Sequence, residues 1–218
     1  LTDPQGNTLS NAQIKTMCQN ALNYNIDVVG EKFHGVWEPN GMLTYCKDVS
    51  GNADSYRAYI RAMDWIVDQE HYVMGFKKYD RVPNTRTLAY INYHYYMYQS
   101  TAGVSFINTE QQYLLNLKFL FDNGSSNGNY GWDKIWGISH EWGHQHQMRP
   151  YFNWAGCDEM SNNVKSYWNT TRAGYSSGYG HGADVATGTA LYNGVVSSGY
   201  LSASDATTYT TIANARSY

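Results

Sequence analysis

The sequence contains few cysteines, few prolines and few charged residues. Its 218 residues include 3 Cys and 4 Pro, and only 15% are Asp, Glu, Lys or Arg. The odd number of cysteines, with none in a Cys-x-x-Cys pair, disfavours a cysteine-based zinc knuckle. Cys18 and Cys46 can form one disulfide, but two buried free thiols are the interpretation that we favour.

Two further absences concern partners. The net charge is -3 and the basic residues are scattered singly, whereas a nucleic-acid-binding surface needs clustered Lys and Arg. No apolar run approaches the length of about 18 residues that marks a membrane-spanning helix. We therefore expect no nucleic-acid partner and no transmembrane segment.

Aromatic residues, in contrast, are abundant. The chain has 21 Tyr and 7 Trp, and 42% of its residues are apolar, which is typical of a folded domain. Tyr and Trp suit carbohydrate or peptide grooves, because each has an apolar face and a polar edge, although they are also common in extracellular chains generally. The abrupt start at Leu1 suggests a piece excised from a longer exported protein. We expect residues 1–218 to form one domain, or a large part of one, with subdomains near 1–130 and 131–218, and we expect this domain to be monomeric.

Local patterns predict mixed helices and strands. Ser10 and Gln13 read as a capping box that opens a short helix, and Asp54 is expected to cap a longer helix that ends near Gly75. Alternation over 86–98 predicts one strand. Further elements are expected as a strand at 104–107, a helix at 109–121, a helix from about 132 to 148 that Pro150 stops, and a helix from 158 to about 168.

The run from His140 to His144 reads His-Glu-x-x-His within the third of these helices. Residues four apart on a helix lie about 40° apart around its axis and about 6 Å along it, so both imidazoles can bind one ion. Glu141 can take a proton from a zinc-bound water and pass it to a leaving amine. The motif predicts His140 and His144 as zinc ligands and Glu141 as the catalytic base.

Catalytic zinc usually takes three protein ligands and leaves one position open. Pro150 stands where a metzincin would have a third histidine, so that class is disfavoured. Glu159 begins the next predicted helix and is our candidate for the third ligand. Asp158 is a close competitor that would face about 100° away and could instead cap the helix, while His181 and Asp184 are weaker candidates.

Two other polar residues lie near the predicted site. Asn163 follows Glu159 by one helical turn on the same face, where its carboxamide could orient a ligand histidine or only bond locally. His146 lies about 240° around the helix from His140. It should therefore point away from the metal, as a surface residue or as a support for the ligands.

These residues carry a family resemblance. The run from Trp136 to Gln147, with Trp154 and the run from Glu159 to Val164, resembles the enhancin and enhancin-like zinc metallopeptidases. The resemblance covers about residues 50 to 170. It implies an α+β fold of the gluzincin-like zincin type, in which a small sheet precedes a mainly helical half and the zinc site lies in the cleft between them. It also implies a secreted or cell-surface protein that attacks mucin-type O-glycosylated proteins.

The family also suggests how substrate is held. An extended peptide would add to a sheet edge, and Gly103, Val104 and Ser105 are the expected edge residues; an ordinary internal strand is the alternative. Trp154 and the loop 175–181 could stack on a sugar, although loop aromatics often only pack.

We therefore expect a zinc-dependent endopeptidase acting on O-glycosylated, mucin-like proteins. One alternative is a catalytically inactive zincin that binds glycoprotein or carbohydrate without cutting, against which the intact Glu141 argues. A second alternative is a peptidase that acts on unglycosylated protein.

Overall fold

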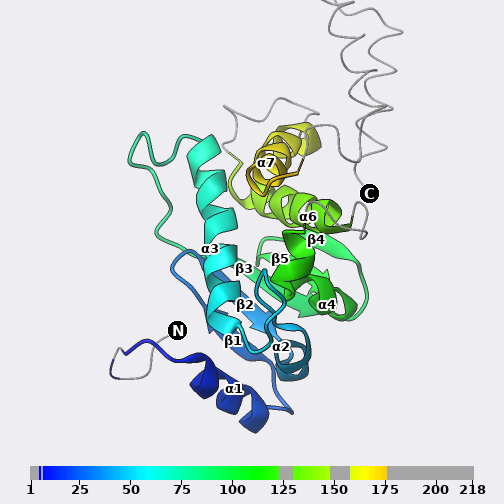
Figure 1. Ribbon diagram of the computed structural model, residues 1–218. Coiled ribbons are helices and arrows are strands. Elements are labelled where there is room, and N and C mark those ends of the chain that lie inside the picture. Colours follow the sequence, from blue (N-terminus) through cyan, green and yellow to red (C-terminus); the bar gives the residue numbers. More distant parts are fainter. Residues whose placement is uncertain (1–4, 6, 123–129, 148–157, 176–218) are drawn as a thin grey trace, which may run out of the picture.

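The computed structural model describes residues 5, 7–122, 130–147 and 158–175, with backbone alone at 130–133 and 158–161 (Figure 1). Its helices and five-stranded sheet confirm the α+β class. None of the described helices is long and apolar enough to cross a bilayer. The elements are α1 (Asn11–Asn20), β1 (Ile26–Val29), β2 (Phe33–Trp37), α2 (Pro39–Tyr45), α3 (Tyr56–Val73), β3 (Thr87–Asn92), β4 (Met97–Gln99), β5 (Val104–Ile107), the 3-10 turn η1 (Asn108–Glu110), α4 (Gln111–Leu114), α5 (Leu117–Leu120), α6 (Tyr130–Gln145) and α7 (Asp158–Arg172).

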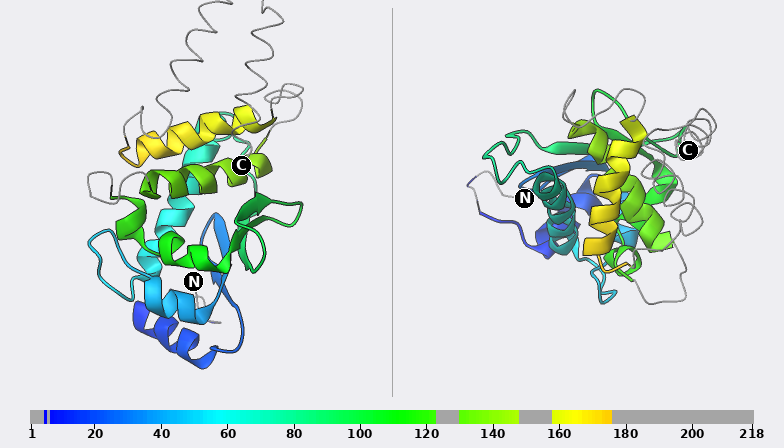
Figure 2. Two further views of the ribbon diagram at one scale, coloured as in Figure 1. Left: turned by 90° about the vertical axis from the view of Figure 1, so that its right-hand side faces the viewer. Right: turned by 90° about the horizontal axis from the view of Figure 1, so that it is seen from above.

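The sheet has the strand order β1-β2-β3-β5-β4. Its β1–β2 and β4–β5 pairs are antiparallel, and its β2–β3 and β3–β5 pairs are parallel. All of these strands precede α6 and α7 in the chain, as expected for a small sheet followed by a helical part. Helix α3 runs across the sheet, and α6 and α7 lie side by side beyond it (Figures 1 and 2).

The prediction of one strand over 86–98 is wrong. Strand β3 ends at Asn92, whose Oδ1 accepts hydrogen bonds from the backbone N–H groups of His94 (2.9 Å) and Tyr95 (2.8 Å). Such an Asx turn competes with the ladder for backbone donors. The chain leaves the sheet at this point and returns as the separate strand β4.

The prediction that Gly103–Phe106 forms a sheet edge is also wrong. Strand β5 pairs with β3 on one side and with β4 on the other, so Val104 and Ser105 lie inside the sheet. Gly103 sits at the tight turn from β4 to β5, where a Cβ atom would lie 2.9 Å from the carbonyl oxygen of Leu88. The edge on this side is β4.

Of the two helix caps predicted from the sequence, that of α1 is present and that of α3 is not. The capping box of Ser10 and Gln13 is confirmed. Asp54 does not cap α3, because its carboxylate accepts hydrogen bonds from Lys15 Nζ (2.7 Å) and the hydroxyl of Tyr56 (2.9 Å). That residue instead ties α1 to the start of α3.

The continuous helix predicted at 109–121 is broken. In its place are η1, α4 and α5, with an interruption at Leu115 and Asn116. The backbone of Lys47 donates to the carbonyl of Leu115 (3.2 Å) and accepts from the N–H of Leu117 (3.0 Å). Asn116 then caps α5 with its side chain. A neighbouring segment therefore takes the backbone groups that a continuous helix would use.

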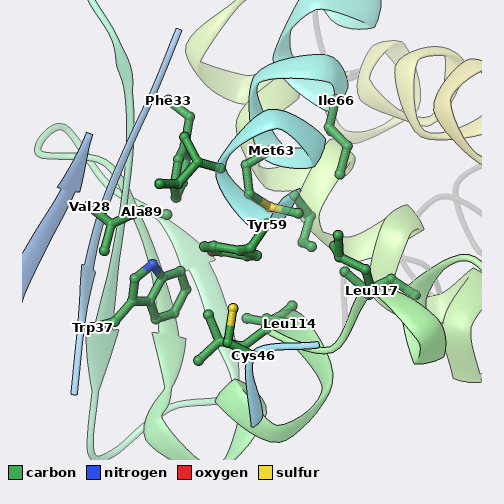
Figure 3. Packing of buried hydrophobic residues seen from close by; sticks show 14 of the residues in the cluster. Val28, Phe33, Trp37, Cys46, Tyr59, Met63, Ile66, Ala89, Leu114 and Leu117 are labelled. Atoms are coloured by element: carbon green, nitrogen blue, oxygen red, sulfur yellow. The ribbon is translucent and has the colours of Figure 1, made fainter. Parts of the chain in front are cut away.

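Aromatic rings connect the sheet to the helices (Figure 3). Phe33 of β2 packs against Tyr59 of α3 at 6.0 Å between ring centroids and against Trp142 of α6 at 5.7 Å. Trp37, also on β2, packs against Tyr59 at 6.3 Å. All four rings are at most 1% exposed, and burying a side chain of this kind contributes about 1.5–3 kcal/mol. This core fixes the position of α6.

Cys18 and Cys46 are buried free thiols, as favoured from the sequence. Burial raises the pKa of Cys18 to about 11 and also raises the pKa of Cys46. Both are therefore protonated at neutral pH and act as small apolar core residues.

Candidate metal centre

Helix α6 places its apolar residues and its two motif histidines on opposite faces. Ile135, Ile138 and Trp142 are buried and form the inner stripe. At about 100° per residue, His140 and His144 lie about 160° and 200° around the axis from Trp142. Core packing of the inner stripe therefore sets the rotation of α6 and turns both imidazoles to the other side.

The two imidazoles are neighbours. The ring centroids of His140 and His144 are 5.1 Å apart, with their planes at 86°. His140 is buried and His144 is half-buried. Partial burial of this kind limits the positions that each ring can take before a ligand arrives.

Amide oxygens lie beside the Nδ1 atoms of both rings. Asn163 Oδ1 on α7 is 3.1 Å from His140 Nδ1, and Gln147 Oε1 is 3.4 Å from His144 Nδ1. An amide oxygen can only accept a hydrogen bond, so each Nδ1 carries the proton and each Nε2 keeps its lone pair. This tautomer is the one in which a histidine binds a metal through Nε2.

The donor set therefore fits zinc. Neutral imidazoles are favoured zinc ligands, and a hydrogen bond at the second ring nitrogen is their usual support. The spacing of Asn163 from Glu159 had suggested its contact with a ligand histidine, whereas Gln147 was missed. The position of Gln147, three residues after His144, was the available signal.

The candidates for the third ligand have side chains outside the described residues. Glu159 lies in the first turn of α7, as the sequence predicted, but its side chain and that of Asp158 lie outside the described part. His181 and Asp184 also lie outside it. Among the described residues no group of three His, Cys, Asp or Glu side chains could hold a metal ion. Glu159 therefore remains a prediction.

Glu141 lies on the side of α6 that faces β4. It is half-buried and follows Gly137 by about one turn on the same side of the helix. At Gly137 the strand comes close, because an added Cβ atom would lie 3.0 Å from Met97 Sδ. The predicted base is thus near the edge strand, and α7 covers the opposite flank of the histidines.

Strand β4 presents backbone groups to the open edge. Ile107 N–H donates to Tyr96 O (2.9 Å), and Ser100 and Gly103 exchange hydrogen bonds of 2.8 and 3.2 Å. In an antiparallel ladder such pairs alternate with pairs whose N–H and C=O groups point outward. Met97 and Gln99 occupy the outward positions, and no strand pairs with this side within the described ranges.

Tyrosines surround the turn that leads into β4. Tyr93, Tyr95 and Tyr96 are 64%, 52% and 47% exposed. Each ring nevertheless has a partner: Tyr93 donates to Glu38 Oε1 (2.9 Å), Tyr96 accepts from Lys134 Nζ (2.7 Å), and the Tyr95 ring lies 5.7 Å from that of Tyr98 between centroids. Exposed rings held in fixed positions are suited to stacking on a ligand.

Of the sugar-stacking residues expected from the sequence, only Tyr175 lies in the described part of the chain. Tyr175, at the start of the expected loop, is buried, and its hydroxyl donates to the carbonyl of Leu120 (2.7 Å). It is therefore a packing residue. Trp154 lies outside the described residues.

His146 is buried, so the surface position is excluded. Its Nδ1 is 2.6 Å from Glu70 Oε2, its Nε2 is 3.1 Å from Thr87 Oγ1, and its ring centroid is 4.8 Å from that of His71. Burial raises the pKa of Glu70, opposed by the hydrogen bond from His146. Burial and then the charge of His146 lower the pKa of His71 to about 4. His146 anchors the end of α6 to α3 and β3.

A family model matches residues 37–182 of this chain: peptidase M60, enhancin and enhancin-like. The matched range contains the two histidines, Glu141 and all of α7. No curated protein matches the chain.

Solved structures share the fold. One is a metallopeptidase from Bacteroides thetaiotaomicron (24% identity, TM-score 0.62, covering 77% of this chain and 26% of that one). A second is a metallopeptidase in complex with Tn antigen (25%, 0.62, 77% and 28%). A third is a conserved protein of unknown function from Bacillus anthracis str. Ames (21%, 0.67, 85% and 36%). This chain thus spans about a quarter to a third of the length of these neighbours.

Proposed function

This chain belongs to the peptidase M60, enhancin and enhancin-like family, and on that premise we propose that it is a zinc-dependent endopeptidase acting on O-glycosylated, mucin-like proteins. The observation that carries the proposal is the paired histidine geometry. The two rings are neighbours, and both Nδ1 atoms face amide oxygens, which favours the tautomer that binds a metal through Nε2. The proposed fold type is a gluzincin-like zincin, and the proposed location is outside the cell or at its surface.

His140, His144 and Glu159 would hold the ion, with Asn163 and Gln147 orienting the two imidazoles. Bound zinc lowers the pKa of a water molecule to about 7 and polarises the scissile carbonyl. Glu141 accepts the proton of the attacking water and then donates it to the leaving amine. A partly buried position suits this work, because a carboxylate shielded from bulk water interacts more strongly with nearby charge.

We place the extended substrate along β4 instead of β5. The outward N–H and C=O groups of Met97 and Gln99 can pair with a peptide added as a further strand. The close approach of Met97 to Gly137 brings this strand to the flank of α6 that carries Glu141. A peptide on this edge would therefore pass the proposed base.

The edge position gives a sharp prediction. Replacing Gln99 with Pro removes one outward N–H but leaves the β4–β5 bonds intact, because Pro is tolerated at edge positions whose N–H faces solvent. Losing one hydrogen bond should raise KM about 2- to 10-fold with little change in kcat. Steady-state kinetics on a defined glycopeptide measures this.

Gln99→Ala is the matched control, since it removes the same side chain and keeps the N–H. Thermal unfolding of both variants checks that the sheet is intact. Equal KM values for the Pro and Ala variants would remove β4 as the substrate edge.

Two observations support a glycan-bearing substrate. One structural neighbour is a metallopeptidase that was solved with Tn antigen. In this chain, the exposed and restrained rings of Tyr93 and Tyr95 border the proposed substrate edge. Aromatic faces of this kind can stack on a sugar while the peptide pairs with β4.

The proposed function is tested by incubating the zinc-loaded chain with a mucin-type glycoprotein and identifying products by mass spectrometry. We expect cleavage that a chelator stops and added zinc restores. Prior enzymatic removal of the O-glycans should reduce cleavage at least about 10-fold, equivalent to about 1.4 kcal/mol of binding energy. Undiminished cleavage would indicate a peptidase acting on bare protein. Bound zinc without any cleavage would indicate a glycoprotein-binding module.

A further inference from the structure

Helices α6 and α7 pack closely at Gly143, the residue before His144. A Cβ atom added at Gly143 would lie 3.0 Å from both Asn162 Oδ1 and Lys165 Cδ on α7. Any larger residue at position 143 would push these side chains away. The absence of a side chain at Gly143 therefore allows α7 to approach α6 between the two motif histidines.

Lys165 fills this contact with a charged group. Lys165 is fully buried (0% exposed). Its Nζ donates hydrogen bonds to the carbonyl of Gly143 and to Asn162 Oδ1, the latter at 3.1 Å. The carbonyls of the last turn of a helix carry partial negative charge. The Gly143 carbonyl accepts the backbone N–H of His146 (3.1 Å), and the buried ammonium of Lys165 is a second donor to it that complements the helix dipole.

We propose that Lys165 is a positioning residue, which fixes α7 against the last turn of α6 and thereby holds Asn163 against His140. The inference rests on the proposed function, because it concerns the arrangement of the proposed zinc ligands. Asn162 and Asn163 are consecutive: one bonds Lys165 and the other bonds His140. If α7 shifted at Lys165, Asn163 would therefore move away from His140. The backbone that carries Glu159 belongs to the same helix and would move with it.

The free-energy cost of burying the Lys165 ammonium group supports a specific role for this residue. Burying an ammonium group is expensive unless it is well paired, and an apolar side chain of similar length would pack at lower cost. Burial lowers the pKa of Lys165 to about 8, opposed by the negative charge of Glu70. The group is still mainly protonated at neutral pH, so it keeps all three donors for its oxygen partners.

The test compares Lys165→Met with Ser166→Ala. Met keeps most of the stem volume and removes the donor and the charge. Ser166 also bonds α7 to an α6 carbonyl, that of Trp136 at 3.1 Å, but this bond lies one turn before the motif. We expect Lys165→Met to raise the zinc dissociation constant about 10- to 100-fold, the range seen when a supporting partner of a ligand is lost. Ser166→Ala should change it within about 2-fold. Chelator competition on the folded proteins measures both.

A double-mutant cycle separates positioning from general packing. If Lys165 acts through Asn163, the effects of Lys165→Met and Asn163→Ala on zinc affinity are less than additive, because either change releases His140. Additive effects, or wild-type zinc affinity in Lys165→Met, would overturn the proposal. A wild-type chain that binds no zinc would instead overturn the proposed function itself.

Gly143→Ala provides a second route if Lys165→Met does not fold. Ala favours the helix over Gly, but its Cβ atom would press on Asn162 and Lys165. We expect zinc affinity to fall at least about 10-fold, as for loss of a ligand's support, in a chain that remains folded by circular dichroism. Unchanged affinity in this variant also counts against the proposal.

Discussion

Replacing Glu141 with Gln is expected to lower kcat/KM about 10²- to 10⁴-fold, the usual contribution of a general base. Gln has nearly the same shape but cannot accept or return a proton. Glu141 is half-buried and directly follows His140 on α6. Kinetics on a glycopeptide, with zinc content measured by metal analysis, gives both the loss of rate and the state of the site.

Zinc content should stay near one per chain in this variant, because Glu141 is the proposed base and not a ligand. Glu31→Gln removes an exposed carboxylate from the β1–β2 turn and controls for the change of net charge. A Glu141→Gln variant that cleaves at the wild-type rate with zinc bound would show that another group transfers the proton.

The local part of the site could be predicted from the sequence. His140 and His144 share a face because helical periodicity places residues four apart together, and Asn163 reaches His140 Nδ1 from the position that its spacing suggested. These relations depend on one or two helices alone. The roles of ligand and base remain predictions, but the side chains of His140 and His144 lie together as the spacing requires.

The sheet edge could not be predicted, because strand order is not a local property. Val104 and Ser105 have the pattern of a strand whether it lies inside a sheet or at its edge. The Asx turn at Asn92 divides what alternation presents as one strand. Strand β4 then forms the edge of the sheet, and we therefore propose β4, not β5, as the substrate edge.

The burial of the ionisable residues His146 and Lys165 could not be predicted from the sequence either. The helical angle of His146 indicated only that it faces away from the metal. Its burial depends on Glu70 and Thr87, which come from segments distant in the chain. Lys165 likewise looks like a solvent-exposed helical residue until α6 is packed against it. Such groups acquire partners only in the folded chain.

Each side of α6 packs against a different part of the structure. Its inner stripe packs on Phe33 and the core, its α7 flank supports His140, and its β4 flank carries Glu141 beside the proposed substrate edge. Gly137 and Gly143 have no side chain, so β4 and α7 can approach α6 closely on either side. Three packing partners, in addition to the proposed metal, therefore constrain the residues of the run from Gly137 to His144.

Replacing Glu159 with Ala should reduce bound zinc to well below one per chain. Glu159 lies in the first turn of α7, the helix that also brings Asn163 to His140, and three protein ligands are usual at a catalytic zinc. Loss of a residue that only supports a ligand raises the zinc dissociation constant about 10- to 100-fold. Loss of a ligand itself should raise it further. Metal analysis after dialysis and chelator competition measure stoichiometry and affinity.

Asp158→Ala is the matched control, because it removes the neighbouring carboxylate from the same helical turn, about 100° around the axis. We expect this variant to keep its zinc, and both variants to unfold at similar denaturant concentrations without metal. Tight, stoichiometric zinc in Glu159→Ala together with loss of zinc in Asp158→Ala would transfer the ligand role to Asp158. Tight zinc in both would place the third ligand elsewhere in the chain, with His181 and Asp184 as the next variants to test.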